Sequence, residues 1–143
     1  LGQIRHPTRD REYYRTIARA MQAVQVGRNT CVCHIGNIPY PEVVGEVADL
    51  LVAMERISWC LVTGHTQRVT TVSIRSTQAG ARAELVMRAI MRGLGRGGGH
   101  GAIAGGAIPC GGAGSYDDNA RLLTERFLSQ LPFRKVDRLS PLS

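Results

Sequence analysis

The sequence is poor in aromatic residues and in lysine. Only 5% of its 143 residues are aromatic, so a folded core must be built mainly from aliphatic side chains. Lys135 is the single lysine among 18 basic residues, and the other 17 are arginine. Because base stacking depends on aromatic side chains, this scarcity argues against a surface that selects a nucleotide sequence by stacking.

Long hydrophobic runs are also missing. The sequence holds no run of 18 apolar residues, which excludes a conventional membrane-spanning helix. Its first ten residues are polar and lack the pattern of a secretory signal peptide, so we expect a cytoplasmic protein with no membrane partner. The chain does not begin with Met, and we expect it to be part of a longer protein.

The motifs of common hydrolases are absent. The sequence contains no HExxH and no GxSxG, and its only adjacent acidic pair is Asp117-Asp118, which the start of a helix explains. A metal-dependent hydrolase needs several Asp and His ligands. The sequence therefore predicts no catalytic residue, no metal site and no cofactor within this chain.

The cysteines do not make a zinc site. Cys31 and Cys33 are separated by one residue and followed by His34, so in a strand the two thiols share one face and the imidazole lies on the other. No second pair of ligands completes a four-ligand set. We interpret the thiols as buried and reduced, which fits a cytoplasmic protein.

What is present fits one globular domain. Apolar residues make up 43% of the chain, enough for a core of ordinary size. The net charge of +7 favours anionic partners, although scattered arginines are equally typical of a solvated surface. Both interpretations stay open at this level.

Periodicity predicts alternating helices and strands. Apolar spacing and capping residues predict helices over 8–24, from Pro41 to Leu51, over 78–92 and over 115–131. Short β-branched runs predict strands over 30–35, 57–63 and 69–75, with a turn at 64–67 and a last strand near 107–108. The predicted fold class is α/β, a single domain with a mixed β-sheet of about four to five strands flanked by helices. We expect a core over about 7–131 and a loosely ordered tail over 132–143.

Glycine is concentrated in one segment. Eleven of the 17 glycines lie between Gly93 and Gly114, around the run Gly97 to Gly106, which contains His100. Consecutive glycines let main-chain N–H groups approach a ligand and form an anion-binding concavity. A short helix beginning at 102–104 would add to the attraction, and a side chain at Gly98 or Gly99 would obstruct binding. The competing interpretation is a flexible glycine loop.

A polar strand accompanies the glycine segment. Alternation places Thr71, Ser73 and Arg75 on one face, with Val72 and Ile74 on the other. A polar face ending in arginine suits a phosphate, because guanidinium can donate two hydrogen bonds to it. The competing interpretation is a solvated strand face.

These two segments together resemble a known family. Gly98-Gly99-His100 followed by Ala104-Gly105-Gly106 resembles the GGH…AGG signature of the DHH-family phosphoesterases, in their C-terminal DHH-associated domain. Ser73-Ile74-Arg75-Ser76 is similar to the S-x-R-S strand of that domain, and the segments 47–51 and around Trp59 are similar too. The likeness covers roughly 7–112.

The resemblance implies a two-domain enzyme that hydrolyses phosphodiester or phosphomonoester bonds. Family members include single-strand exonucleases, oligoribonucleases, nucleotide phosphatases and cyclic-dinucleotide phosphodiesterases. An N-terminal DHH domain holds two metal ions, usually manganese (Mn²⁺), and the associated domain grips the substrate. By motif position, the substrate-binding residues here would be Ser73, Arg75, Ser76, Gly98, Gly99 and His100.

Two departures bear on this implication. Gly101 stands where the family often has Pro, and no Asp-His-His sequence occurs, so the catalytic DHH domain is expected outside this chain. We therefore expect a substrate-binding domain that is inactive alone, with two partners: the DHH domain of the same protein, and a nucleotide or short single-stranded nucleic acid. The alternatives are a stand-alone nucleic-acid-binding module and a structural or oligomerisation domain. A homodimer is left open.

Overall fold

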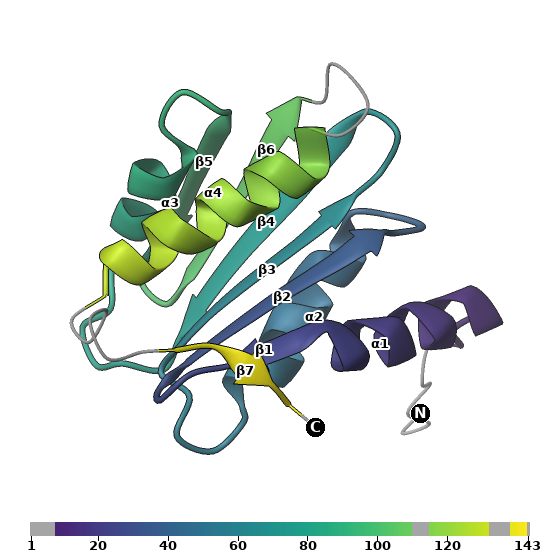
Figure 1. The fold of residues 1–143 in the computed structure, drawn as a ribbon, viewed down its shortest axis with the longest axis horizontal. Coiled ribbons are helices and arrows are strands. Elements are labelled where there is room, and N and C mark those ends of the chain that lie inside the picture. Colours follow the sequence, from purple (N-terminus) through teal and green to yellow (C-terminus); the bar gives the residue numbers. More distant parts are fainter. Residues whose placement is uncertain (1–7, 110–114, 132–137, 143) are drawn as a thin grey trace, which may run out of the picture.

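The computed structural model describes residues 8–109, 115–131 and 138–142. Four helices and seven strands alternate along these ranges (Figure 1). In chain order they are α1 (Arg11–Ala23), β1 (Val24–Val26), β2 (Thr30–Asn37), α2 (Glu42–Val52), β3 (Trp59–His65), β4 (Val69–Ser76), α3 (Ala83–Met91), β5 (Arg96–His100), β6 (Ile103–Pro109), α4 (Ser115–Ser129) and β7 (Ser140–Pro141).

The strands form one mixed sheet in the order β5-β6-β4-β3-β2-β1-β7. Among the described strands only β2 and β3 run parallel, and α2 connects them; the other neighbours are antiparallel. A parallel pair needs such a crossover, whereas antiparallel neighbours need only a short turn. The predicted α/β class with a mixed sheet is confirmed, and the sheet has more strands than the four to five predicted.

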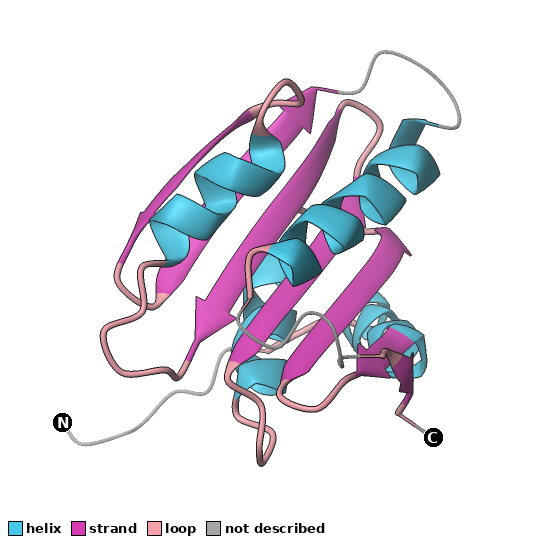
Figure 2. Ribbon diagram, turned by 60° about the vertical axis from the view of Figure 1, so that its left-hand side comes forward, coloured by secondary structure: helices cyan, strands magenta, loops and turns pink. Residues whose placement is uncertain are grey.

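Two helices cover each face of the sheet (Figure 2). α1 and α2 bury apolar residues such as Val47 and Leu51 against β2 and β3 on one face. α3 and α4 bury others, such as Met87 and Phe127, against the opposite face. The two largely aliphatic clusters follow from the alternation of side chains along each strand.

Local sequence signals explain where the helices begin. The Asp10 carboxylate accepts a hydrogen bond from the Tyr13 N–H at 2.9 Å, which satisfies one unpaired donor of the first turn of α1. α2 begins directly after Pro41, as predicted. α3 is shorter than predicted, because residues 78–82 precede it as turns and irregular backbone.

The buried thiols lie where alternation places them. Cys31, Cys33 and Cys60 are free and buried in the cluster beneath α1 and α2, and His34 faces α4 on the other side. Burial raises the pKa of the Cys33 thiol to about 12, and its sulfur contacts the Ala20 carbonyl at 3.3 Å. Cys110 lies outside the described residues.

The glycine segment forms a β-hairpin, so the expected loop and the short helix at 102–104 were wrong. β5 and β6 pair from Arg96↔Ala107 to His100↔Ile103, and Gly101 takes a φ of 62° in the tight turn. Pairing with β4 supplies β6 with hydrogen-bond partners, which outweighs the low β propensity of glycine. The last predicted strand, near 107–108, is the end of β6. Gly111, Gly112 and Gly114 lie outside the described residues.

Three smaller expectations also need correction. Val24 belongs to β1 and not to the first helix, and β3 continues through Gly64 and His65, so the turn follows at Thr66. In the expected loose tail, Ser140 and Pro141 form β7 and pair with β1, while 132–137 and 143 lie outside the described residues. Within the described ranges, no helix is both long enough and apolar enough to cross a membrane.

Candidate functional site

Strand register brings most of the predicted binding residues together. Arg75 of β4 lies opposite Ile103 of β6, which lies opposite His100 of β5. Ser73, Gly105 and Gly98 form a second row beside the first. Residues directly opposite in antiparallel strands share a face, so Ser73, Arg75, Gly98 and His100 lie on one face of three neighbouring strands.

Part of this face is uncovered, and we call it the hairpin platform: Arg96, Gly98 and His100 of β5 with Ile103, Gly105 and Ala107 of β6. All six are exposed in the described structure, and the Ile103 side chain is 54% exposed. α3 covers the other side of the hairpin, while α2 packs on β3 and β4 (Figures 1 and 2). The platform is therefore a shallow surface of small residues bordered by cationic and imidazole side chains.

Arg75 is held at the border of the platform beneath α2. Its Nε donates to the Asp49 carboxylate at 2.7 Å, and the Arg75 side chain is only 13% exposed. Its Nη1 donates to the carbonyls of Ile74 and Ala104, at 3.1 and 3.5 Å. Nη2 makes no hydrogen bond within the described residues and lies 3.0 Å from where a Cβ on Gly45 would be. Glycine at position 45 thus makes room for the guanidinium against α2.

Gly98 and Gly99 face different surroundings. A Cβ on Gly98 would meet nothing within 4 Å, whereas a Cβ on Gly99 would lie 2.2 Å from the Ile103 carbonyl oxygen. Gly97 packs as tightly, since its Cβ would lie 2.5 Å from Met87 Cγ. Of the two predicted glycines, therefore, Gly98 opens onto the platform and Gly99 is required by packing inside the hairpin.

The two serines differ in the same way. Ser73 is buried on the platform face at the border with α2, 6% exposed. Ser76 lies on the opposite face, where its Oγ donates to the Ser58 carbonyl at 2.7 Å and accepts from the Gln78 N–H. The structure does not bring Ser76 to the platform; its hydroxyl joins the end of β4 to neighbouring loops.

The hairpin turn is anchored to α3. The Ala83 N–H donates to the Gly101 carbonyl at 2.7 Å. The next residue, Glu84, accepts from Arg82 at 3.1 Å, and its own backbone N–H, Arg82 and nearby His100 lower the pKa of its carboxyl. One Glu84 oxygen is buried without a hydrogen-bond partner in the described residues. A carboxylate and His100 thus lie near one another at the turn of the hairpin.

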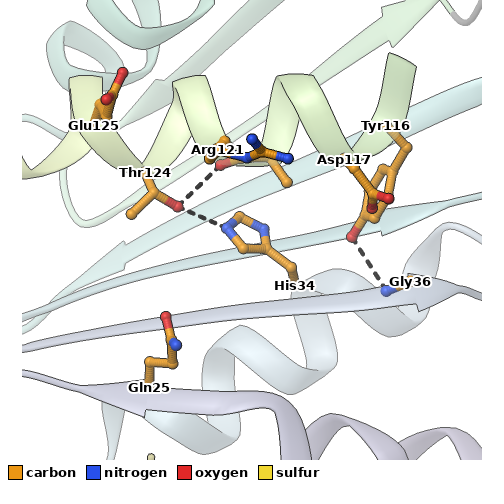
Figure 3. A pocket seen from close by; sticks show the side chains of 9 residues that line it. Gln25, His34, Gly36, Tyr116, Asp117, Arg121, Thr124 and Glu125 are labelled. Atoms are coloured by element: carbon orange, nitrogen blue, oxygen red, sulfur yellow. Dashed lines mark hydrogen bonds between the residues drawn. The ribbon is translucent and has the colours of Figure 1, made fainter. Parts of the chain in front are cut away.

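A second polar site lies across the sheet, in a cavity of about 490 Å³ between α4 and strands β1 and β2 (Figure 3). His34 is at its base. Nδ1 of His34 lies 2.7 Å from the Thr63 hydroxyl and Nε2 lies 2.7 Å from the Thr124 hydroxyl. The Tyr116 hydroxyl lies 2.8 Å from that of Thr63 and accepts from the Gly36 N–H at 3.1 Å.

These groups form one directed chain of hydrogen bonds. Thr124 donates to the Ala120 carbonyl at 2.9 Å, so its oxygen accepts from Nε2–H of His34. Nδ1 of a neutral imidazole must then accept from Thr63, which leaves Tyr116 to donate to Thr63. Burial lowers the pKa of His34 to about 4, against a smaller opposing effect of Asp117. Both ring nitrogens are occupied, so His34 joins α4 to the sheet and is not available as a general base.

Sequence reasoning missed this chain, since its members come from β2, β3 and α4. His34 and Thr124 are separated by 90 positions, and neither belongs to a recognisable motif. The only available signal was alternation, which placed His34 on the face opposite the cysteines. Among residues 8–109, 115–131 and 138–142, no group of three or more His, Cys, Asp or Glu side chains is arranged so that it could bind a metal ion.

Comparison with known proteins identifies the fold. No protein-family model and no curated protein sequence matches the chain. Among solved structures, it is similar to an exopolyphosphatase-related protein from Bacteroides fragilis, with a TM-score of 0.64 and 13% identity over 90% of this chain. It is also similar to RecJ from Thermus thermophilus in complex with Mg²⁺, with a TM-score of 0.55 and 21% identity over 85% of this chain.

A third similar structure is a single domain. The C-Ala domain of alanyl-tRNA synthetase from Aquifex aeolicus matches with a TM-score of 0.56 and 17% identity, over 73% of this chain and 96% of that domain. The chain spans only 37% of the exopolyphosphatase-related protein and 18% of RecJ. The shared feature is therefore a fold that occurs as one part of larger proteins.

Proposed function

We propose that this chain is the DHH-associated, substrate-binding domain of a cytoplasmic metal-dependent phosphoesterase. The hairpin platform would bind a phosphate of a nucleotide or short single-stranded nucleic acid. Strand register carries this proposal, because it places Arg75, which is far from the other two in the sequence, at the border of the uncovered face that carries Gly98 and His100. The motif resemblance and the fold shared with an exopolyphosphatase-related protein and RecJ support it.

The chemistry of the platform suits an anion. Nη2 of Arg75 and the ring of His100 supply donors on either side of Ile103, and Gly98 lets a phosphate approach the backbone without meeting a side chain. Strands in a sheet are about 4.8 Å apart, so Arg75 and His100, two strands apart, are about 10 Å apart at their Cα atoms. One phosphoryl group reached by both long side chains fits between them.

The proposed reaction takes place in the partner DHH domain. The residues described here offer no cluster of metal ligands, so we assign the two expected manganese ions to that domain and no catalytic step to this chain. Here Arg75, Gly98 and His100 would orient the phosphate. Orienting a substrate can lower the activation barrier of a reaction by several kcal/mol.

Binding of a labelled trinucleotide at low salt tests the proposal. We expect weak, salt-sensitive binding with little sequence preference, measured by fluorescence anisotropy. His100→Ala should weaken it about tenfold, the effect of one lost hydrogen bond to a charged group. Arg11→Ala, which removes an exposed charge from α1, is the matched control. No binding by the unmodified chain, or equal losses in both variants, would contradict the proposal.

A specific observation favours one alternative. The C-Ala domain of a tRNA synthetase is matched over 96% of its length, so the same fold occurs in a protein of another class. A nucleic-acid-binding module without a phosphoesterase partner would bind oligonucleotides through the same platform. Isolation of the complete natural protein separates the two: a polypeptide with a manganese-dependent phosphoesterase domain supports the first function, and one without it supports the second.

A further inference from the structure

Two surface cavities meet at the outer edge of the hairpin. One, of about 590 Å³, lies beyond the far end of the platform and is lined in part by Arg68, Leu94, Gly95 and Arg96. The other, of about 310 Å³, lies between β5 and α3 and is lined in part by Arg88, Arg92, Gly95 and Arg96. Gly95 and Arg96 line both cavities, which are therefore neighbours. We call the four arginines 68, 88, 92 and 96 with these cavities the arginine groove.

The charge of the arginine groove is uncompensated. All four guanidinium groups belong to exposed residues, and none forms an ion pair within the part of the chain that the structure describes. The described residues lining the two cavities include no Asp or Glu. By contrast Arg9, Arg15, Arg75 and Arg82 each pair with a carboxylate. Four like charges gathered without a counter-charge repel one another and attract a polyanion.

The C-terminal end of α3 is fixed in a way that holds part of the groove in place. Nη1 of Arg126, from α4, donates to the carbonyls of Ile90 and Arg92 at 2.9 and 2.8 Å. These carbonyls would otherwise lack partners at the end of the helix. The backbone that carries Arg92 is therefore braced by α4, and a fifth guanidinium lies beside the groove.

Arg96 connects the arginine groove with the hairpin platform. His100 and Arg96 are the two ends of β5, about 13 Å apart at 3.3 Å per residue. Arg88 and Arg92 are one helical turn apart, about 6 Å along the axis of α3. A strand held at His100 by one phosphate and running along β5 would reach Arg96 at the other end of β5, where Arg88 and Arg92 line the smaller cavity beside it.

The groove also offers apolar surface between its charges. Val69, Leu94 and Pro109 line the larger cavity beside Arg68 and Arg96. Aliphatic side chains can contact a base or sugar, and guanidinium planes can stack on a base without selecting its identity. An acidic peptide would leave this apolar surface without a matching partner.

From this combination we infer that the arginine groove binds the backbone of a single-stranded oligonucleotide whose terminal phosphate lies at Arg75 and His100. This inference rests on the proposed function and deepens it. The substrate class is then a strand of several nucleotides, and a mononucleotide or cyclic dinucleotide would leave the groove empty.

A length series on the 143-residue chain tests the inference. The probes are labelled single-stranded oligoadenylates of about two and about eight nucleotides. Their binding is measured from about 20 to about 200 mM salt, which spans roughly one decade of ionic strength. The unmodified chain should bind the octamer at least tenfold more tightly than the dimer. Arg88→Gln and Arg92→Gln should each weaken octamer binding roughly three- to fivefold, as expected for one exposed ionic contact, and leave dimer binding unchanged.

The salt dependence supplies an independent readout. For single strands, the slope of log K against log salt changes by about 0.7 for each phosphate contact, so each groove variant should lower the octamer slope by about that amount. Arg11→Gln is the matched control, since it removes the same charge from α1 and should change neither slope nor affinity beyond the general effect of net charge.

The outcomes separate the two claims. Length-independent binding, or equal effects of Arg11→Gln and Arg92→Gln, would overturn the groove while leaving the platform intact. No binding of either probe, with folding intact by circular dichroism, would overturn the proposed function as well. If polyglutamate competes for the groove as strongly as the octamer at an equal number of negative charges, the groove is a site for acidic proteins. That result would also overturn the inference.

Discussion

Two adjacent glycines in β5 have different structural roles. Gly98 faces open space on the hairpin platform, and Gly99 faces the backbone of β6. One sequence motif thus combines a residue that keeps a surface clear with a residue that lets two strands approach. A motif of consecutive glycines does not reveal this division, because only the strand register assigns each position to a face.

A matched pair of substitutions separates the two roles. Gly98→Val should keep the free energy of unfolding within about 1 kcal/mol, since its side chain meets no neighbour, but should block trinucleotide binding. Gly99→Val should destabilise the domain by several kcal/mol, because its Cβ would collide with the Ile103 carbonyl. Urea denaturation and fluorescence anisotropy measure both quantities. Equal stability of the two variants would contradict the assigned faces.

Among the elements, α4 depends on a polar contact as well as on apolar packing. Leu123 and Phe127 bury its apolar face, while Tyr116 and Thr124 connect it to the sheet through Thr63 and His34. The chain of hydrogen bonds requires a neutral imidazole, which makes the attachment of α4 dependent on pH. Asp117, Arg121 and Glu125 of α4 also line this cavity, with Gln25 from β1.

The pH dependence has a defined sign. The pKa of His34 is about 4 in the folded chain and near 6.5 in the unfolded chain, so only the unfolded state binds the proton between these values. The stabilisation is complete above pH 6.5 and is lost as the pH falls towards 4. Between pH 7 and pH 5 the loss should be on the order of 2 kcal/mol.

Urea denaturation of the unmodified chain and of the His34→Gln variant at several pH values measures this loss in the free energy of unfolding. The variant should be less stable at pH 7, and the difference between the two should shrink towards pH 5. Gln22→Ala, which changes an exposed and non-ionisable side chain of α1, should show a nearly constant difference from the unmodified chain. A difference that stays constant for His34→Gln as well would show that the imidazole is not buried in its neutral form.

The helices and central strands follow from the sequence better than the edges of the sheet do. Asp10 and Pro41 begin α1 and α2 through local chemistry, and alternation correctly placed the cysteines and His34 on opposite faces of β2. β5 was missed because glycine disfavours strands in isolation. β1 and β7 are short, and their pairing with distant residues has no local signal.

The motifs named residues of the candidate site, but they did not reveal how the site is arranged. The motifs named Arg75, Gly98 and His100. Three further features depend on how the neighbouring elements pack around β4: the ion pair between Arg75 and Asp49, the hydrogen bonds of Ser76 on the other face, and the space at Gly45. The arginine groove was not predicted, since Arg68 and Arg96 are brought together only by the folding of the hairpin.

For the whole molecule, binding and catalysis should be separable. We expect no hydrolysis of oligonucleotides or nucleotides by the 143-residue chain, even with added manganese, because hydrolysis in the proposed enzyme needs metal ligands of the DHH domain. In a protein that contains both domains, His100→Ala should lower turnover strongly without changing bound manganese. Turnover assays and metal analysis of one preparation measure both.

The control for this prediction is the purified isolated chain carrying His100→Ala. Manganese-dependent turnover by the unmodified isolated chain that this variant abolishes would show that the active site lies here. Loss of manganese from the two-domain His100→Ala protein would show instead that His100 contributes to the metal site.

The position of β5 at the rim of the sheet has a consequence for how ligand occupancy could be observed. Among the described strands β5 pairs with β6 alone, so no described strand covers its outer amide protons, while those of β3 are enclosed by strands on both sides and helices on both faces. Amide hydrogen exchange should therefore be graded across the sheet, fast at β5 and slow at β3. A strand of nucleic acid lying along β5 would shield those fast amides first, and the glycine amides of 97–99 would report its arrival without any label on either molecule.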